Sequence, residues 1–470
     1  MSIPVISITQ MREWEKASWD AGKSEAEVIR QVGRLVAHEA LRWTKTGDAV
    51  LILAGKGHNG DDARCAREHL AERRVDVFEV KDAKADFPKL EAALSSRPAL
   101  VIDGLFGIGI NRPLDAAWLK FIGRINAAKL CVLAVDVPSG LNADSGEPQG
   151  AAIEAAVTLT VGAPKIGMLK SHASPFVGRL VVAEDTGLID CPHTEEFQWT
   201  VPGDFEGFPP RRPVEGHKGT FGHVAILAGS PGYHGAAVLA SRGAQRAQPG
   251  LITLFTQERA YVPIASQLQA VMVQTWSPQT ELSEKFTCVL VGPGLASPEV
   301  PEELKETARQ LWCESPAPMI ADASALDWLL ATGVTPRNSL RVVTPHPGEA
   351  ARLLKKSAAD VQSDRTGSVR KISKRLGDCW VVLKGHQTLV GRSEGPIFIN
   401  SSGNPFLGQG GSGDSLSGYL AGLLAQRALQ NDPERTIRFA VWQHGAAADR
   451  LTRTRPNWVV EDLLEELGAV

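Results

Sequence analysis

Short apolar runs, most of which end in glycine or aspartate, recur along the whole chain. They are VLILAG (50–55), LVID (100–103), CVLAVD (131–136), VAILAG (224–229), CVLVGPG (288–294) and PMIADA (318–323). Most are followed by apolar residues at helical spacing, and a continuous apolar run of this length is typical of a parallel strand that is covered on both faces. The pattern therefore predicts an α/β protein with parallel sheets and crossover helices.

The chain is long enough for two domains, since its 470 residues exceed the roughly 250–300 at which a single hydrophobic core stops growing. The stretch TVPGDFEGFPPRRPVEGHKG (200–219) has four prolines and no periodicity, which favours a linker. Both sides of it open with a strand, a glycine loop and a helix, in VLILAGKGHNGDDA (50–63) and VAILAGSPGYHGAA (224–237). We predict a Rossmann-like α/β/α sandwich over residues 1–205 and a second α/β domain over residues 206–470.

Charge and cysteine content limit the classes of binding partner and the compartment that we expect. The 50 basic and 53 acidic residues are mixed along the chain, so no basic stripe indicates nucleic acid or an anionic membrane. The six cysteines are far apart and read as reduced core residues. No secretory signal pattern and no run of ~20 apolar residues is present. We expect a cytoplasmic protein with small-molecule partners, no nucleic acid and no membrane.

The stretch LGQGGSGDSLSG (407–418) carries the first candidate chemistry. Leucines spaced as on one helical face follow Asp414, so Asp414 is expected at the start of a helix with one buried face. Glycines before a helix N-terminus let backbone N–H groups approach a phosphate. A carboxylate beside them suits the base that takes a proton from a hydroxyl attacking a phosphoryl group. Taken alone, a G-x-G-D loop would more often hold its aspartate as a helix cap.

Two further stretches have candidate ligands. CWVVLKGHQTLV (379–390) predicts a hairpin whose turn holds Lys384, a residue that could meet a nucleotide phosphate. VVTPHPGEAARLL (342–354) places His346 at the carboxyl end of a predicted strand, where open α/β sheets bind ligands. Each of them, taken singly, could be no more than a turn.

In this order, these stretches resemble the ribokinase-like NAD(P)H-hydrate dehydratase family, which uses ADP, or ATP in eukaryotic members, to dehydrate damaged nicotinamide cofactors. The resemblance covers about residues 215–470 and also includes VGPGLA, IADASAL and HGAAAD. It implies a ribokinase-like domain with Asp414 as catalytic base, amides of Gly410 to Gly413 on the phosphoryl oxygens, and Mg²⁺ on the nucleotide. The implied nucleotide contacts are Lys384, Gly385, His386, Gln387, Thr388 and Gly413, and the implied contacts to the hydrated cofactor are Ala236, Gly294, His346 and Asp414. Ser324 and Ala296 depart from the family's D-A-D-A-L and G-P-G-L-G.

The first half offers a candidate cation site. Asn59, Asp103 and Ser139 each follow a different predicted strand, so their oxygens could converge on one hard cation, although polar loop residues also gather by chance. Asp136 ends an apolar strand and could accept a proton, bind substrate hydroxyls, or simply be satisfied by the amides of its turn.

GKGHNGDDA, VIDGLFGIGINRPL (101–114) and VLAVDVPSGLNADSGEP (132–148) resemble the NAD(P)H-hydrate epimerase domain, over about residues 8–190. The resemblance implies K⁺ bound by Asn59, Asp103 and Ser139, and catalytic Asp136 at the hydrated carbon. The implied substrate-binding residues are His58, Asn59, Gly60, Asp61, Asp62, Gly107, Ile108, Gly109, Ile110, Asn111, Arg112, Pro113 and Asp136. His58, Asp61 and Ala63 depart from the family's N-N-G-G-D-G.

Together the resemblances imply one chain with two activities on the hydrated cofactor, which is written NAD(P)HX. It interconverts the R and S epimers and dehydrates the S epimer to NAD(P)H, while ADP becomes AMP and phosphate. A homo-oligomer is expected. Two alternatives stay open: a ribokinase-like vitamin-precursor kinase, which shares the G-x-G-D loop, and a working dehydratase behind an inactive first domain. The second rests on Asp61, which puts a negative charge where the backbone should meet the substrate's phosphates. The residues do not decide whether the protein uses ADP or ATP, or whether it prefers NADHX or NADPHX.

Overall fold

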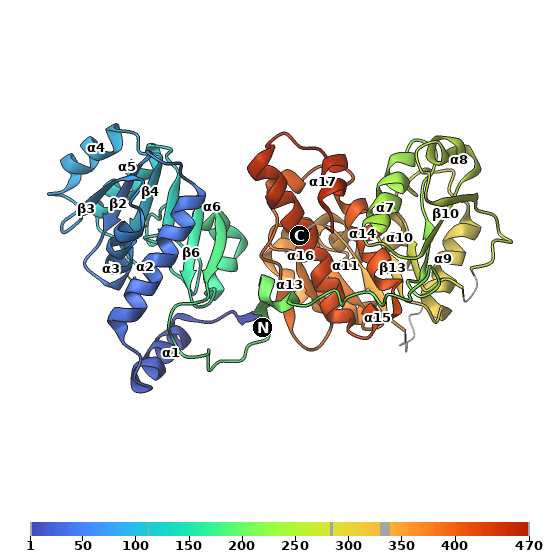
Figure 1. Cartoon of the computed structure of the whole chain (residues 1–470), viewed down its shortest axis with the longest axis horizontal. Coiled ribbons are helices and arrows are strands. Elements are labelled where there is room, and N and C mark those ends of the chain that lie inside the picture. The colour runs from blue at the N-terminus through green and yellow to red at the C-terminus, as the bar shows by residue number, and fades with distance from the viewer. Residues whose placement is uncertain (1, 111, 283–284, 330–338, 469–470) are drawn as a thin grey trace. The chain divides into compact units, whose positions relative to one another are not determined.

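The computed structural model describes residues 2–110, 112–282, 285–329 and 339–468 (Figure 1). The chain divides into two compact units, which we call the N-terminal unit (Ile3–Glu195) and the C-terminal unit (from Glu196 onward). Both are built on largely parallel sheets with crossover helices, which confirms the predicted α/β class. Within the described residues, no helix combines the length and the apolar character needed to cross a membrane.

The N-terminal unit is a three-layer α/β/α sandwich. Its sheet is parallel throughout, with the strand order β3-β2-β4-β5-β6-β7. The strands are β1 (Ile3–Pro4), β2 (Ala49–Ala54), β3 (Arg74–Glu79), β4 (Leu100–Gly104), β5 (Val132–Val135), β6 (Val157–Val161) and β7 (Arg179–Ala183). The helices are α1 (Ile8–Asp20), α2 (Glu25–Arg42), α3 (His58–Ala66), α4 (Phe87–Ser95), α5 (Ala116–Ala127) and α6 (Ser174–Val177), with short 3₁₀ turns η1 (Arg67–His69), η2 (Ile166–Leu169) and η3 (Ser171–Ala173).

Alternate residues of β2 enter two different cores. Val50 and Ile52 pack with α2 and α3, whereas Leu51 and Leu53 pack with α4 and α5. Because successive strand residues point to opposite faces, a strand buried on both faces reads as a continuous apolar run. This is why the sequence pattern located the strand.

The strand order places a topological switch point between β2 and β4. After β3 the chain crosses over β2 and continues on its other side, so the loops that follow β2 and β4 turn in opposite directions. In open parallel sheets the crevice at such a point, beyond the carboxyl ends of the strands, is where ligands bind.

The C-terminal unit has the strand order β8-β17-β16-β15-β14-β13-β12-β9-β10-β11. Only the pairs β15–β16 and β16–β17 of this series are antiparallel. The strands are β8 (Phe197–Trp199), β9 (His223–Leu227), β10 (Leu251–Thr256), β11 (Met272–Thr275), β12 (Cys288–Val291), β13 (Met319–Ala321), β14 (Arg341–Val343), β15 (Trp380–Leu383), β16 (Leu389–Gly391) and β17 (Ile397–Ile399).

The helices of this unit are α7 (His234–Arg246), α8 (Glu258–Ala265), α9 (Glu302–Glu314), α10 (Ser324–Leu329), α11 (Pro347–Leu354), α12 (Ala358–Ser363), α13 (Arg365–Arg375), α14 (Ser412–Leu424), α15 (Arg427–Gln430), α16 (Pro433–Thr454) and α17 (Val460–Glu466), with 3₁₀ turns η4 (Pro202–Phe205) and η5 (Pro405–Leu407). Residues 196–205, which the sequence analysis assigned to the first domain, belong to this unit. The reason is that β8 pairs with β17, and Phe205 is buried against Phe439 and Trp442.

Helix α14 is buried on all sides rather than on one face, since every residue from Ser415 to Leu424 is buried. A β-carbon at Gly418 would lie 1.9 Å from the Ala240 carbonyl oxygen, so α7 crosses at a distance that only glycine permits. The two helices run in parallel, because Gly411 lies against Leu239 and Gly422 lies against Ala247. Their N-termini therefore lie at the same edge of the unit.

Candidate active sites

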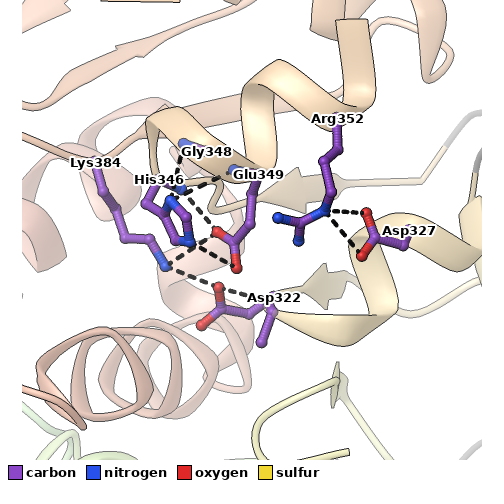
Figure 2. Close-up of polar contacts among 8 residues, drawn as sticks. Asp322, Asp327, His346, Gly348, Glu349, Arg352 and Lys384 are labelled. Atoms are coloured by element: carbon purple, nitrogen blue, oxygen red, sulfur yellow. Dashed lines mark hydrogen bonds and ion pairs between the residues drawn. The ribbon is translucent and has the colours of Figure 1, made fainter. Parts of the chain in front are cut away.

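The polar centre of the C-terminal unit is formed where three neighbouring strands end. Asp322 follows β13, Glu349 lies in the first turn of α11 after β14, and Lys384 follows β15. Figure 2 shows Lys384 reaching toward both carboxylates, with its Nζ 3.0 Å from Asp322 Oδ1 and 3.9 Å from Glu349 Oε2. A β-carbon at Gly413 would lie 3.1 Å from the same Nζ, so the glycine loop lies against the ammonium group.

Asp414, in the first turn of α14, completes this centre electrostatically. Burial, followed by the Asp322 carboxylate, raises the pKa of Asp414 to about 7, while Lys384 opposes the shift and Glu349 adds to it. Burial lowers the pKa of Lys384, but Asp322, Glu349 and Asp414 outweigh this effect and the net pKa is raised. A carboxylate that titrates near neutral pH beside a permanent cation is suited to general-base catalysis.

His346 caps α11 and faces the same centre. Its Nδ1 accepts the Gly348 N–H at 3.0 Å, and its Nε2 lies 3.5 Å from Glu349 Oε1 (Figure 2). The backbone N–H of His346 donates to Glu349 Oε2 at 2.8 Å, which closes a capping box. Because Nδ1 accepts, the neutral ring carries its proton on Nε2, where it can donate to a ligand.

The Lys384–Thr388 turn joins β15 to β16, as the hairpin pattern predicted. Gly385 and Gln387 both have positive φ, and Thr388 Oγ1 donates to the Gly385 carbonyl at 3.1 Å. Arg365 donates to the His386 carbonyl at 2.5 Å from behind the turn, and burial lowers the pKa of this arginine to about 10. Burial, then Arg365, lowers the pKa of His386.

Gly294 and Ala236 are two small residues of this unit that lie against each other. A β-carbon on Gly294, which has φ +65, would lie 3.0 Å from the Ala236 Cβ and 2.4 Å from the Tyr233 carbonyl oxygen. Ala236 is near the start of α7, and the parallel packing of α7 on α14 brings that start to the edge that holds Asp414.

Three residues of this centre were not among the predicted site residues: Asp322, Glu349 and His444. His444 lies on α16 beneath the glycine loop, with its Nε2 3.2 Å from Ser415 Oγ. Burial lowers the pKa of His444 to about 4, so its ring is neutral at neutral pH. Asp322 and Glu349 had a sequence signal, since each follows an apolar run, but nothing in the sequence indicated that Lys384 joins them.

The N-terminal unit contains a cavity of about 1020 Å³ at the switch point between β2 and β4. Ten of the predicted site residues line it: His58, Asn59, Asp62, Gly107, Ile108, Gly109, Ile110, Arg112, Pro113 and Asp136. Gly60 and Asp61 do not line it, and Asn111 lies outside the described residues. Gly60 shapes the turn instead, because a β-carbon there would lie 2.2 Å from the Gly55 carbonyl oxygen.

Asp61 is held away from the cavity by an arginine. Its Oδ1 lies 2.5 Å from Arg64 Nη1, and the same guanidinium bonds Glu79 at 2.7 Å. The negative charge that Asp61 adds to the glycine loop is therefore paired outside the cavity.

The reactive end of the cavity is acidic. Asp136 has φ +61, and its Oδ1 lies 2.5 Å from the Nζ of Lys165, a lysine that is fully buried. Burial, then Asp136, Asp61 and Glu15, raises the pKa of Asp62 to about 8. Burial, then Asp136, also raises the pKa of Glu15. Asp62 is therefore a proton donor at neutral pH, and it interacts electrostatically with Asp136, whose carboxylate is bonded to the Lys165 ammonium group.

Lys165 and Glu15 were not among the predicted residues. Lys165 follows β6 in the stretch GAPKIG, where it could have been read as one more polar residue at a strand's carboxyl end.

Asn59, Asp103 and Ser139 are brought together around the Phe106 backbone. Ser139 Oγ donates to Asp103 Oδ1 at 2.6 Å, Ser139 N donates to Asp103 Oδ2 at 2.8 Å, and Asn59 Nδ2 donates to the Phe106 carbonyl at 2.9 Å. Burial raises the pKa of Asp103 to about 6, although the Ser139 hydrogen bonds oppose the shift. Among the residues that the structure describes, no lysine or arginine forms an ion pair with this fully buried carboxylate. A monovalent cation bound by these oxygens would balance its charge.

Comparison with known proteins extends over nearly the whole chain. Residues 224–467 match the family model described as NAD(P)H-hydrate dehydratase, and residues 78–167 match the model described as YjeF-related protein N-terminus. The bifunctional NAD(P)H-hydrate repair enzyme Nnr of Coxiella burnetii is 34% identical over 475 residues, covering 94% of this chain and 93% of that protein. Its counterpart in Escherichia coli is 32% identical over 450 residues, covering 90% of this chain and 84% of that protein.

Among solved structures, a ribokinase-like superfamily protein from Enterococcus faecalis matches with a TM-score of 0.52 and 25% sequence identity. The match covers 59% of this chain and 96% of that protein. It identifies the fold of the C-terminal unit as ribokinase-like.

Proposed function

Because this chain belongs to the family of bifunctional NAD(P)H-hydrate repair enzymes, we propose that each compact unit performs one of the two activities. The C-terminal unit dehydrates the S epimer of NAD(P)HX to NAD(P)H while ADP becomes AMP and phosphate. The N-terminal unit interconverts the R and S epimers. The observation that carries the first assignment is Asp414, whose pKa is raised to about 7 at the start of a glycine-rich helix.

In the dehydratase site, the oxygen of the ring hydroxyl attacks the terminal phosphoryl group of ADP. Asp414 takes the proton of this hydroxyl during the attack. AMP leaves, and the hydroxyl oxygen becomes a phosphate ester, which is a far better leaving group. Departure of phosphate, with loss of a proton from the neighbouring ring carbon, restores the double bond of the dihydropyridine. The net change is transfer of one water molecule from the cofactor to ADP.

The surrounding residues hold charge during this transfer. Lys384 and the amides of Gly410 to Gly413 would bind phosphoryl oxygens, since a helix N-terminus favours anions. The described residues contain no set of three His, Cys, Asp or Glu side chains that could hold a metal by themselves. Mg²⁺ would be carried on the nucleotide, where it would neutralise charge on the phosphates, and the buried carboxylates Asp322 and Glu349 of this centre could help to hold it.

The dehydratase assignment is tested with two matched variants, each supplied with S-NADHX, ADP and Mg²⁺. Asp414→Asn should abolish the return of dihydropyridine absorbance. Asp327→Asn should leave it unchanged, because Asp327 pairs with Arg352 at 3.0 Å on the far side of α11 from Lys384 (Figure 2). Activity retained by Asp414→Asn would refute the assignment, and a stable phosphorylated product would favour the kinase alternative.

In the epimerase site, Asp136 and Asp62 can act as a base and an acid. Asp136 takes the proton of the hydroxyl on the hydrated carbon as the bond from that carbon to the ring nitrogen opens, which gives an aldehyde. Asp62, which is protonated at neutral pH, supplies a proton to the nitrogen. Rotation and the reverse proton transfers close the ring on the opposite face. K⁺ held by Asn59, Asp103 and Ser139 would fix the loops after β2, β4 and β5 around the cavity.

This assignment is tested by following exchange between purified R and S epimers by chromatography. Asp136→Asn should slow the exchange to the spontaneous rate. Asp76→Asn should leave it intact, because Asp76 is exposed on β3 and does not line the cavity. If the wild-type protein shows no exchange above the spontaneous rate, the N-terminal unit is not an epimerase and the alternative of an inactive first domain holds.

A further inference from the structure

Two lysines stand at neighbouring positions on one wall of the N-terminal cavity. Ala54 and Glu79 are paired in register as the last residues of β2 and β3, and Lys56 and Lys81 each follow two residues later. Neighbouring strands are about 4.8 Å apart. Both lysines line the cavity, so their side chains can converge on one group.

Within the described part of the chain, neither Lys56 nor Lys81 forms an ion pair with a carboxylate. Glu79 and Asp86 interact electrostatically with Lys81, but both have other partners. Glu79 bonds Arg64 at 2.7 Å, and Asp86 Oδ2 accepts the backbone N–H of Lys81 at 2.8 Å. The pair therefore places two ammonium groups without ion-pair partners on the cavity wall, within the described residues.

Arg12 and Arg112 also line the cavity, but the proposed proton-transfer groups and the two lysines lie at different places along the sheet. The acidic end of the cavity lies at Asp136, which follows β5, and its basic wall lies at the ends of β2 and β3. The order β3-β2-β4-β5 separates Asp136 from the end of β2 by two strand spacings, about 10 Å, and from the end of β3 by three, about 14 Å. Acidic groups suit the proton transfers at the hydrated ring, whereas the basic wall can only attract an anionic part of the substrate.

The groups of a dinucleotide follow one another in the same order as these residues along the sheet, from the ring through the pyrophosphate to the adenosine ribose. With the hydrated ring at Asp136, the pyrophosphate would reach the N-terminus of α3, which begins after Gly57. The N–H groups of Gly60 and Asp61 bond the Gly57 carbonyl, so those of His58 and Asn59 would be the ones to meet the phosphates. The adenosine ribose then lies beyond it, toward β3. In dinucleotide-binding sheets, an acidic residue after the second strand accepts the ribose 2′-hydroxyl, and a basic residue nearby accommodates a 2′-phosphate. Here the residues at that place are lysines.

We propose that Lys56 and Lys81 form a subsite for the 2′-phosphate of the substrate, so that the N-terminal unit prefers NADPHX to NADHX. The proposal rests on the epimerase function proposed above and specifies its substrate. It assigns the two lysines a role in binding and none in the proton transfers.

The test compares epimerisation of NADPHX and NADHX by the full-length protein and by Lys56→Gln, Lys81→Gln and the double variant. The wild type should have the lower KM for NADPHX. Each substitution should raise the KM for NADPHX by about tenfold, the size expected for one charge-assisted hydrogen bond. The KM for NADHX and both kcat values should stay unchanged. Lys84→Gln is the matched control, since Lys84 is an exposed lysine of the same loop that does not line the cavity.

Three results would overturn the proposal: equal wild-type KM values for the two hydrates, an equal loss for both hydrates in the lysine variants, or a loss of the same size in Lys84→Gln. The second would place the lysines at the pyrophosphate. Calorimetric titration with NADP⁺ and NAD⁺ separates this question from turnover. If the protein does not epimerise either hydrate, weaker binding of NADP⁺ alone by the double variant still supports the subsite, and unchanged binding refutes it.

Discussion

Replacing Asp414 with asparagine should make the C-terminal unit more stable while it removes dehydratase activity. The native environment of Asp414 disfavours its charge, because the carboxyl is largely buried and faces the Asp322 carboxylate. Asparagine has nearly the same shape and carries no charge to be desolvated. The stabilisation should depend on pH, which separates it from a change in packing.

The sign and size of this change in stability follow from the pKa of Asp414. The native pKa of Asp414 is about 7, against an ordinary value of 3.8, so between these pH values the native state holds a proton that the unfolded state has released. Wild-type stability therefore falls as the pH rises from about 4 to about 7, and levels off above. The full shift corresponds to about 4 kcal/mol. Because the side chain is partly exposed and solvent screens its charge, we expect about 1–3 kcal/mol for Asp414→Asn over wild type at pH 8, and less at pH 5.

The assay is urea unfolding of the nucleotide-free protein at pH 5 and pH 8, followed by circular dichroism. The transition of the C-terminal unit is the one whose midpoint ADP raises, because a ligand stabilises the unit that it binds. Asp327→Asn is the control, since it removes an exposed ion pair and should cost at most about 1 kcal/mol. A difference between Asp414→Asn and wild type that is the same at both pH values, or a variant that is less stable than wild type at pH 8, would refute the reasoning.

Three further predictions concern single sites. The dehydratase rate should rise with pH through an apparent pKa near 7, and Asp322→Asn should move that pKa downward because it removes a charge that raises the pKa of Asp414; a pH–rate profile checks both. Gly60→Ala should destabilise the N-terminal unit by several kcal/mol, since its β-carbon would meet a carbonyl oxygen at 2.2 Å, whereas Gly57→Ala, with no atom within 4 Å, should be nearly neutral in thermal unfolding. Lys165→Met should cost about 3–5 kcal/mol in urea unfolding and abolish epimerisation, because it leaves a buried carboxylate without its ammonium partner.

The sequence predicted those parts of the fold that depend on local pattern. The apolar runs at 50–55, 100–103, 131–136, 224–229, 288–294 and 318–323 are β2, β4, β5, β9, β12 and β13, because strands covered on both faces have no polar positions. The hairpin at 379–390 was also predicted, since both strands and their turn are contiguous. The one-sided burial predicted after Asp414 was wrong, because α7 packs against the glycines of α14, and that contact joins segments about 170 residues apart in the printed sequence.

Contacts between distant segments decided the parts of the sites that sequence reasoning missed. Lys384 reaches Asp322, 62 residues earlier, so the predicted nucleotide-binding lysine is also the counter-ion of the carboxylates around Asp414. Asp61 pairs with Arg64 three residues later on the same helix, and Arg64 in turn bonds Glu79 on the neighbouring strand. The Lys384–Asp322 and Arg64–Glu79 pairs join different elements, so no local pattern predicts them.

We conclude that one chain converts both epimers of the hydrated cofactor to NAD(P)H. The most direct test is the time course of an equal mixture of R and S NADHX with the full-length protein, ADP and Mg²⁺, following dihydropyridine absorbance and AMP together. The account predicts complete conversion with one AMP formed per NADH, and with Asp136→Asn a stop at the S half followed only by spontaneous epimerisation. A wild-type reaction that itself stops at the S half, or NADH that returns without AMP, would contradict it.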